Sequence, residues 1–347
     1  MPYAKPPSEV SSTPTALRTG VVGAGLMGRW HAHAITRLGG RVVAVIDPES
    51  ARAERLAARL AHRPAVASNL DRAIREHRVQ VLHVCSPLAT HADIVRAAIE
   101  AGVHVLVEKP LAADAATAEA LHALATDRGV LLCPVHQFLF QSGILAAQSA
   151  LATVGTLRQF DVIACSAGAD GASDAERESV ALDILPHGLA LARRLLGAPV
   201  ADADWQVAGG APGELRAVSD VAGASLMLAV SMRARPTENS LTLRCDRGTI
   251  HANLFHGYAT IERGSPSRLD KVARPLVGSS RALGAAVGNL ARRVVRREPA
   301  YPGLRELIRR FHLASAGQGP SPISVDESLD VARARDSILR ARSLPAR

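Results

Sequence analysis

Short apolar runs alternate with longer amphipathic segments over the first 135 residues. Residues 18–22, 41–46 and 103–107 are short and mostly apolar, as expected of strands buried on both faces. Residues 26–38 and 91–101 repeat apolar positions with helical spacing. This alternation predicts right-handed β-α-β crossovers and a parallel sheet. The same pattern predicts further helices over 50–60, 70–76 and 113–128, and further strands over 65–67, 81–85 and 130–134.

The pattern changes after about residue 140. Helices are predicted over 143–151 and 181–196, with a strand over 156–164 between them. Residues 200–262 read as a run of strands, and the sequence Asp246-Arg247-Gly248 is typical of a turn between two of them. This second half therefore predicts a largely antiparallel sheet in a fold of α+β type.

Composition narrows the class of protein. The chain is 48% hydrophobic and 21% charged, as in ordinary globular proteins. No apolar run reaches the ~18 residues of a membrane span, and residues 1–15 lack the apolar core of a secretory signal. Four widely spaced cysteines without a CxxC pair predict reduced thiols and a cytoplasmic protein. His31 and His33 face different ways on a predicted helix, so no metal site is expected.

The first strand leads into a glycine motif. Gly23, Gly25 and Gly28 match G-x-G-x-x-G, and the motif follows a strand and opens a helix, as a dinucleotide-binding loop requires. The glycines permit a tight turn, a close approach to the pyrophosphate and close helix–strand packing, while the helix start attracts the phosphates. We expect this loop, with Leu26 and Met27, to hold a nicotinamide dinucleotide.

Three later strand ends complete the predicted cofactor site. Asp47 lies 19 residues after the last glycine, where an acid holds the ribose hydroxyls of NAD, although it is also placed to serve as a simple helix cap. NAD is favoured, while the nearby Arg52 leaves NADP open. Ser86 and Pro87 are expected to shape the nicotinamide pocket, and His91 to cap or pack at the next helix start. We also assign Glu108 and Lys109, which follow the fifth strand, to the cofactor site.

These observations predict two domains of different class. The first is an α/β Rossmann domain with a parallel doubly wound sheet, and the second is an α+β domain with a largely antiparallel open sheet. The predicted boundaries are a disordered leader at 1–16, the dinucleotide-binding domain at 17–140 and a substrate domain at 141–320. A capping box at Ser324 and Glu327 opens a C-terminal helix, and residues 321–347 are expected to pack back on the body.

Three ionisable residues form the predicted catalytic set. Lys109 lies at the carboxyl end of a strand, where open α/β sheets bind ligands. Asp183 and His187 are four residues apart and share one helix face. Oxidation of an alcohol needs a base for the hydroxyl proton and a cation for the developing alkoxide. We expect His187 to be the base, Lys109 to hydrogen-bond the hydroxyl oxygen and Asp183 to orient the substrate or the imidazole. Alternatively, Asp183 and His187 are a surface pair on a capped helix.

Three segments together resemble the Gfo/Idh/MocA family, the glucose–fructose oxidoreductase and inositol dehydrogenase group. They are residues 23–31, residues 86–91 with the run 101–110 that ends in Glu108-Lys109-Pro110, and residues 183–187 with the sequence Leu195-Leu196-Gly197. The resemblance implies a Rossmann domain, an antiparallel sheet whose open face forms a homodimer or homotetramer, and Lys109, Asp183 and His187 as the catalytic set. It also implies a sugar, cyclitol, sugar acid or nucleotide-linked sugar as substrate and a cis peptide before Pro110.

The chain departs from the family pattern on the substrate side. His136 and the residues up to Phe140 replace a frequent Arg or Tyr, residues 178–181 replace a glycine-rich stretch, and Ala190 replaces an acid. The sequence therefore predicts redox chemistry without specifying a sugar. Two alternatives remain: a glycosidase- or epimerase-type enzyme that uses NAD transiently, and a non-catalytic nucleotide-binding protein.

The positive charge is concentrated in one segment. The net charge is +9, and residues 268–297 hold eight Lys or Arg against one acid. The rest of the chain is nearly balanced and has few aromatic residues, so no nucleic-acid partner is expected. Leu283, Val287, Leu290 and Val294 fall on one helical face of the segment. This predicts a membrane-surface helix or a clamp for an anionic substrate, or else a lid or inter-subunit helix with a solvated basic face.

Overall fold

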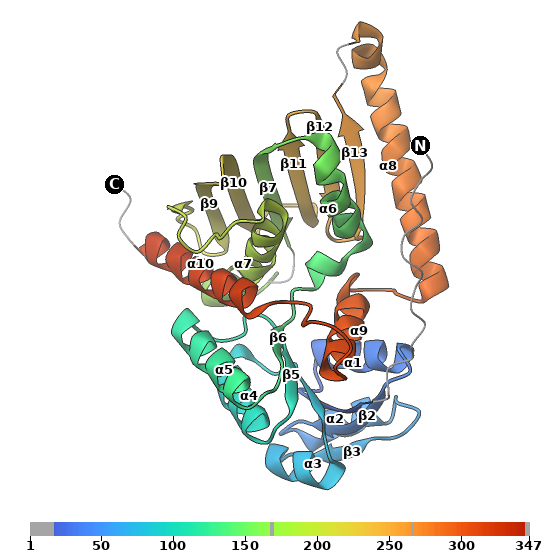
Figure 1. The fold of residues 1–347 in the computed structure, drawn as a ribbon, viewed down its shortest axis with the longest axis vertical. Helices are drawn as coiled ribbons and strands as arrows, with labels where there is room; N and C mark the ends of the chain where they lie inside the picture. The colour runs from blue at the N-terminus through green and yellow to red at the C-terminus, as the bar shows by residue number, and fades with distance from the viewer. Residues whose placement is uncertain (1–16, 167–169, 265–266, 344–347) are drawn as a thin grey trace.

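The computed structural model describes residues 17–166, 170–264 and 267–343. The predicted leader at 1–16 lies outside the described residues. Two sheets, one from each half of the chain, lie at opposite ends of the molecule with helices between them (Figure 1). The α/β and α+β classes predicted from the sequence are thereby confirmed.

The N-terminal sheet is parallel throughout and has the strand order β3-β2-β1-β4-β5-β6. Its strands are β1 (Arg18–Val22), β2 (Arg41–Ile46), β3 (Ala65–Ala67), β4 (Val81–Val84), β5 (His104–Val107) and β6 (Leu132–Pro134). Its helices are α1 (Leu26–Arg37), α2 (Ser50–Ala57), α3 (Leu70–His77), α4 (His91–Glu100) and α5 (Ala115–Asp127), with a 3-10 turn at Leu88–Thr90. The order reverses between β1 and β4, and such a reversal creates a crevice for a ligand at the carboxyl ends of the strands.

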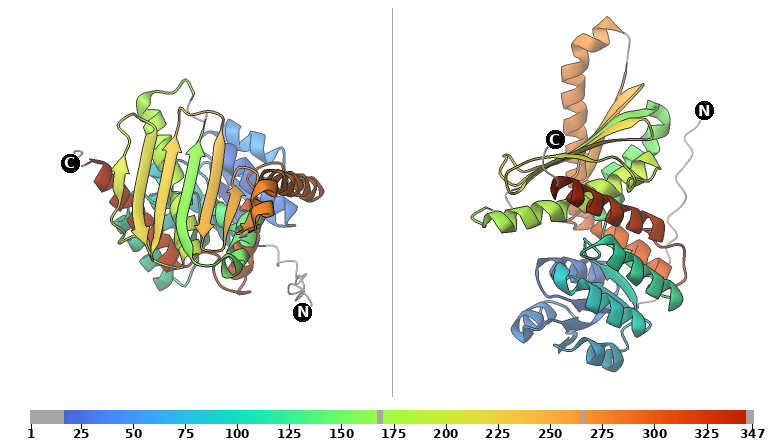
Figure 2. Two further views of the ribbon diagram at one scale, coloured as in Figure 1. Left: turned by 90° about the horizontal axis from the view of Figure 1, so that it is seen from above. Right: turned by 90° about the vertical axis from the view of Figure 1, so that its left-hand side faces the viewer.

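The second sheet has seven strands in the order β13-β12-β11-β7-β10-β9-β8. They are β7 (Leu157–Cys165), β8 (Gln206–Ala208), β9 (Glu214–Val221), β10 (Ala224–Ser231), β11 (Glu238–Cys245), β12 (Gly248–Asn253) and β13 (Tyr258–Arg263). All neighbours are antiparallel except β7 and β10. Helices α6 (Ser142–Val154) and α7 (Asp174–Leu196) lie on the side that faces the first domain, and the other face is open (Figure 2). A 3-10 turn at Gln137–Phe140 leads from the first sheet to α6.

Two helices differ from the sequence prediction. Helix α7 begins at Asp174, seven residues before the predicted start, behind a capping box of Ser173 and Glu176. Its first turns are polar, so the apolar period did not reveal them. Helix α9 (Leu304–Ser315) was not predicted, although its buried residues repeat with helical spacing. It packs against α1. The other C-terminal helices are α8 (Arg268–Arg296) and α10 (Val325–Ser343).

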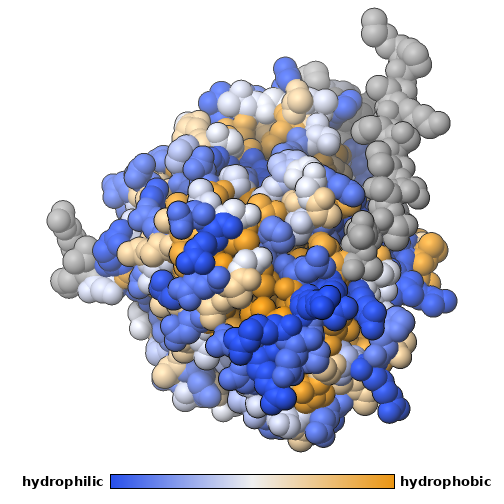
Figure 3. Space-filling model, turned by 60° about the horizontal axis from the view of Figure 1, so that its bottom comes forward, coloured by the Kyte–Doolittle hydropathy of each residue, from blue (hydrophilic) through white to orange (hydrophobic). Residues whose placement is uncertain are grey.

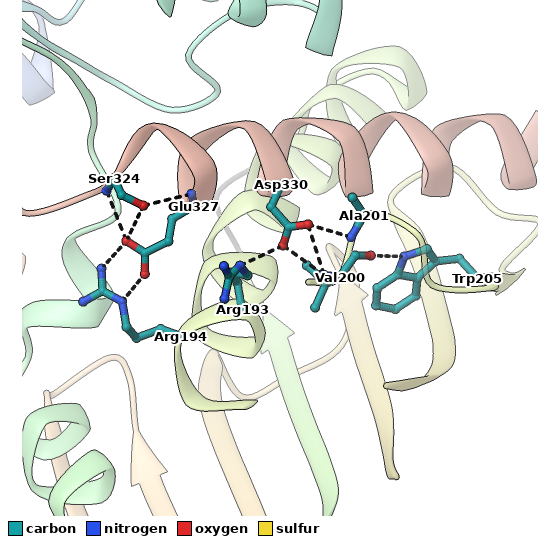
Figure 4. Close-up of polar contacts among 8 residues, drawn as sticks. All are labelled: Arg193, Arg194, Val200, Ala201, Trp205, Ser324, Glu327 and Asp330. Carbon is teal, nitrogen blue, oxygen red and sulfur yellow. Dashed lines mark hydrogen bonds and ion pairs between the residues drawn. The ribbon is translucent and has the colours of Figure 1, made fainter. Parts of the chain in front are cut away.

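Helix α10 connects the two halves of the molecule. It contacts α5 and β6 of the first domain and α7 and β8 of the second. The buried Asp330 carboxylate accepts hydrogen bonds from Val200 N at 2.9 Å and Ala201 N at 3.0 Å (Figure 4). The same carboxylate pairs with Arg193 of α7 at 3.3 Å. One turn earlier, Glu327 pairs with Arg194 (Figure 4). These buried contacts fix α10 to the second domain.

The surface of the Rossmann side is largely hydrophilic, with apolar residues gathered in a band across its centre (Figure 3). Among the described helices, none combines the length and the apolar character needed to cross a bilayer.

Candidate active site

The glycine loop has the backbone that its motif predicts. Gly23 has a φ of +88°, and a Cβ there would lie 2.6 Å from the carbonyl oxygen of Cys85. A Cβ on Gly28 would lie 1.8 Å from the carbonyl oxygen of Gly23. Both positions therefore require glycine for reasons internal to the fold. A Cβ on Gly25 would meet nothing within 4 Å, so the space above this residue is open to a ligand.

The start of α1 fits the phosphates of a dinucleotide. Its N-cap is Gly25, and no side chain caps the helix. The first backbone N–H groups thus remain available at the positive helix end. A hollow of about 210 Å³ adjoins them. It is lined by Ala24, Gly25 and Leu26 of the loop, by Leu56, and by the side chains of Arg29, Arg52, Arg55 and Arg59. Of the four arginines, only Arg52 was singled out from the sequence. The spacing of Arg52, Arg55 and Arg59 nevertheless indicates one cationic face of the helix predicted over 50–60.

Asp47 holds the glycine loop in place. The residue is only 4% exposed, and its carboxylate accepts hydrogen bonds from Ala24 N at 2.8 Å and Glu49 N at 2.9 Å. Each oxygen keeps a second lone pair, so its role toward the ribose stays a prediction. Glu49 pairs with Arg52 at 2.7 Å and Arg55 at 3.3 Å. Met27, the other predicted loop contact, packs against the core.

His91 ties together two loops of the predicted nicotinamide side. Its Nδ1 lies 2.9 Å from the carbonyl oxygen of Pro110, and its Nε2 lies 2.9 Å from that of Ser86. The Ser86-Pro87 turn and the segment after β5 are thereby held at a fixed separation. The Lys109–Pro110 peptide is cis, which confirms what the family resemblance implied.

The predicted catalytic residues meet where the two domains face each other. Lys109 follows β5, and its Nζ donates a hydrogen bond to the carbonyl oxygen of Asp183 on α7 at 2.8 Å. The Asp183 side chain is half-buried and has no hydrogen bond or ion pair within the described part of the chain. His187 lies one turn further along α7 and is 8% exposed. A lysine and a histidine far apart in sequence thus occupy one site.

The environment of His187 keeps its ring neutral. Burial, and then the nearby charges of Lys109 and His136, lower its pKa well below the ordinary value. The ring stacks on Phe138 with centroids 4.3 Å apart. Its Nδ1 has no hydrogen-bond partner among the described residues. A neutral, fixed imidazole of this kind can accept a proton at pH 7.

Two further buried polar groups lie beside this site, on the segment after β6. His136 Nδ1 and Gln137 Oε1 have no partner in the described structure. Burial is the main cause that lowers the pKa of His136 to about 4. Buried polar atoms are nearly always satisfied in folded proteins, so this pair points to hydrogen bonds with a bound molecule. The sequence marked the segment only as a departure from the family pattern.

Glu108 ends a chain of buried histidines. Its Oε1 lies 3.0 Å from Nε2 of His31, whose Nδ1 lies 2.9 Å from Nδ1 of His83. His83 Nε2 lies 3.0 Å from Nε2 of His312 on α9. Burial alone would raise the pKa of Glu108, but the His31 hydrogen bond and the charges of His31 and Lys109 outweigh it and lower the pKa. The Glu108 carboxylate is therefore engaged in the hydrogen bond with His31. Its predicted contact with the cofactor stays a prediction.

Among the described residues, no group of three or more His, Cys, Asp or Glu is arranged to hold a metal ion.

Comparison with known proteins finds similarity to oxidoreductases, and in sequence it is concentrated in the N-terminal half of the chain. Residues 17–136 match the model of a family described as "Oxidoreductase family, NAD-binding Rossmann fold", the GFO_IDH_MocA family. A UDP-N-acetylglucosamine 3-dehydrogenase from Acidithiobacillus ferrooxidans is 36% identical over 138 residues, which are 37% of this chain and 42% of that protein. Myo-inositol dehydrogenase Hyg17 from Streptomyces leeuwenhoekii is 33% identical over 181 residues, 51% of this chain and 55% of that protein. The chain thus aligns with about half the length of these curated relatives.

The likeness in fold extends further than the likeness in sequence. The WlbA dehydrogenase from Bordetella pertussis, solved with NADH and UDP-GlcNAcA, superposes with a TM-score of 0.76. The superposition covers 95% of this chain and 98% of that one at 19% identity. At this identity the match shows a common two-domain fold.

Proposed function

We propose that the whole protein is an NAD(P)-dependent dehydrogenase of the Gfo/Idh/MocA family, since residues 17–136 match that family's model with its NAD-binding Rossmann fold. Its reaction moves a hydride between the nicotinamide and a hydroxyl-bearing carbon of a sugar, a cyclitol or a nucleotide-sugar. The family model, the uncapped start of α1 and the open space above Gly25 support the cofactor.

Each catalytic residue has a separate task. Bound NAD supplies the acceptor for the hydride that leaves the alcohol carbon. His187, neutral because it is buried, takes the hydroxyl proton on a ring nitrogen. Lys109 uses one N–H on the Asp183 carbonyl oxygen and has two left to stabilise the alkoxide oxygen. The unpaired Asp183 carboxylate accepts a hydrogen bond from a second substrate hydroxyl.

The hydrogen bond from Lys109 to α7 is the single observation that carries this proposal. It is a contact between residues 74 positions apart. A structural lysine would neutralise a carboxylate, but this one bonds a backbone carbonyl beside an unpaired Asp183. The Lys109 side chain thus lies near the buried His187 without a carboxylate partner, which is the arrangement that acid–base chemistry on a hydroxyl group needs.

Substitution of Lys109 tests the mechanism. Lys109→Met should lower kcat by about 10²–10⁴-fold, the usual contribution of a proton-handling or oxyanion-stabilising group. NADH binding, followed by nicotinamide fluorescence, should stay within about threefold because the phosphates and the adenosine are held elsewhere. His33→Gln, a change on the exposed face of α1, should leave both quantities unchanged. Turnover that survives in the Lys109 variant would remove Lys109 from the mechanism.

The substrate panel separates the dehydrogenase from its alternatives. A dehydrogenase changes the absorbance of reduced nicotinamide with one nucleotide-sugar or cyclitol of the panel. An enzyme that uses NAD transiently converts a sugar with no net change in that absorbance. A non-catalytic binding protein does neither, although it still binds NADH.

We also propose a cytoplasmic location, which four free cysteine thiols support. We further propose a homodimer or homotetramer that forms through the open face of the second sheet.

A further inference from the structure

Helix α8 displays an unusual concentration of apolar side chains. Of the twelve large hydrophobic residues exposed in the described part of the chain, eight lie on this one helix. They are Val272, Leu276, Val277, Leu283, Val287, Leu290, Val294 and Val295, with exposed fractions from 40% to 82%. Helix α8 stands at one edge of the molecule, beside β13 (Figures 1 and 2). A partner must therefore come from outside the described fold.

The helix is attached to the body through its small residues. Gly278, Ala282, Ala285 and Ala286 are half-buried, and Asn289 is buried and donates a hydrogen bond to the carbonyl oxygen of His256 at 2.9 Å. This arrangement is the reverse of an ordinary amphipathic surface helix, whose large apolar residues face the core. The large apolar residues of α8 are instead turned outward.

The exposed apolar residues form a broad face rather than a narrow seam. At 100° per residue, the eight side chains cover an arc of about 140°. Leu276, Leu283 and Leu290 lie near one edge of the arc, while Val277 and Val295 lie near the other. Pairing with the same helix of a second copy would use a narrow stripe and leave those two valines in water. The acyl-chain region of a lipid bilayer, by contrast, is wide enough to cover all eight side chains of the arc.

The charges beside this face favour an anionic partner. Arg281, Arg292 and Arg296 follow the edge of the arc that ends at Val277 and Val295. All three are exposed, and within the described part of the chain none forms an ion pair with an acid. Arg292 reaches only the hydroxyl of Ser142, at 3.1 Å. A helix with a wide apolar face, an arginine border and a length of 29 residues has the properties of helices that lie in the plane of a membrane surface.

We propose that α8 is a peripheral membrane helix, which inserts its apolar face among the acyl chains of an anionic lipid bilayer while its arginines contact the headgroups. The protein does not cross the bilayer in this arrangement. The sheet and the Rossmann domain stay in water on the other side of the helix, joined to it through Asn289 and the small residues.

Vesicle cosedimentation tests this proposal with the full chain, without substrate or cofactor, so the result is independent of the proposed dehydrogenase activity. The probes are vesicles of phosphatidylcholine alone and vesicles with about one third phosphatidylserine. The protein should bind the anionic vesicles at least tenfold more tightly than the neutral ones, and this preference should weaken as salt is raised. The variant with Leu283→Ser, Val287→Ser and Leu290→Ser should lose at least tenfold of the affinity. The control Val66→Ser with Val325→Ser, at exposed apolar residues outside α8, should bind like the parent protein.

Two results would overturn the proposal. One is a parent protein that stays in the supernatant with both kinds of vesicle. The other is an oligomer, measured by light scattering, that dissociates in the α8 variant while neither protein binds lipid, which would assign the face to a second copy of the chain. Arg281→Gln, Arg292→Gln and Arg296→Gln together should reduce binding to anionic vesicles while leaving the oligomeric state unchanged.

Discussion

Gly25 and Gly28 belong to one motif but meet different surroundings. Gly28→Ala should strongly destabilise the fold, because its methyl group would lie 1.8 Å from the carbonyl oxygen of Gly23. Gly25→Ala places its methyl group in open space, so it should change the free energy of unfolding by only about 0.5 kcal/mol while weakening NADH binding at least tenfold. Urea denaturation and nicotinamide fluorescence measure the two effects. If Gly25→Ala binds NADH like the parent, the pyrophosphate does not approach this residue.

Residue identities revealed the functional site only in part. Gly23 and Lys109 were predictable because each lies at the end of a strand, and the order of strands decides which ends meet. The contact of His83 with His312 joins residues 229 positions apart. His83 is the single polar residue of an apolar strand, and His312 lies in a helix that also carries several arginines, so neither stands out as part of a cluster. Only the packing of α9 on the first domain brings them together.

At the scale of elements, the attachment of α10 depends on one carboxylate. Asp330→Ala would leave Val200 N and Ala201 N without their acceptor and Arg193 without its counter-charge. Val200 is buried, while Ala201 and Arg193 are half-buried. The free energy of unfolding should fall by about 3–5 kcal/mol, as when one partner of a buried ion pair is removed. Glu76→Ala, which breaks an exposed pair with Arg72, should leave the urea midpoint unchanged. An unchanged midpoint for Asp330→Ala would show that apolar packing alone holds α10.

Most elements followed from the apolar pattern, since five of the six strands of the first sheet are mainly buried and read as short apolar runs. The beginning of α7 was missed because a polar capping box, rather than an apolar period, sets its first turns. The parallel pairing of β7 with β10 was not visible either. The order of strands in a sheet depends on contacts between segments far apart in the sequence, and the local apolar pattern does not indicate those contacts.

For the whole molecule, buried histidines set the response to acid. His122, His136 and His312 each have a pKa lowered to about 4, mainly by burial. In the unfolded chain the same groups titrate near ~6.5. The unfolded state therefore binds protons first as the pH falls, and stability that is complete above about pH 6.5 is lost toward pH 4. Each of the three groups should lower the free energy of unfolding by about 2 kcal/mol between pH 7 and pH 5.

Urea denaturation at pH 7 and pH 5 checks this expectation. The midpoint should fall markedly between the two values, since the combined loss is comparable with the ~5–15 kcal/mol stability of a typical domain. His122→Gln should reduce the difference between the urea midpoints at pH 7 and pH 5 by the contribution of one histidine. His62→Gln, at an exposed position, should leave that difference unchanged. Equal midpoints at pH 7 and pH 5 in the parent protein would contradict the argument.

Helix α10 is synthesised after every segment that it contacts, because α5, β6, α7 and β8 all precede it in the chain. While the ribosome is still translating, the apolar surfaces that this helix will cover stay uncovered on both halves of the nascent polypeptide. The joint between the halves can close only once the turns of α10 have left the exit tunnel. The two halves can therefore take up their own folds before they are fastened to each other.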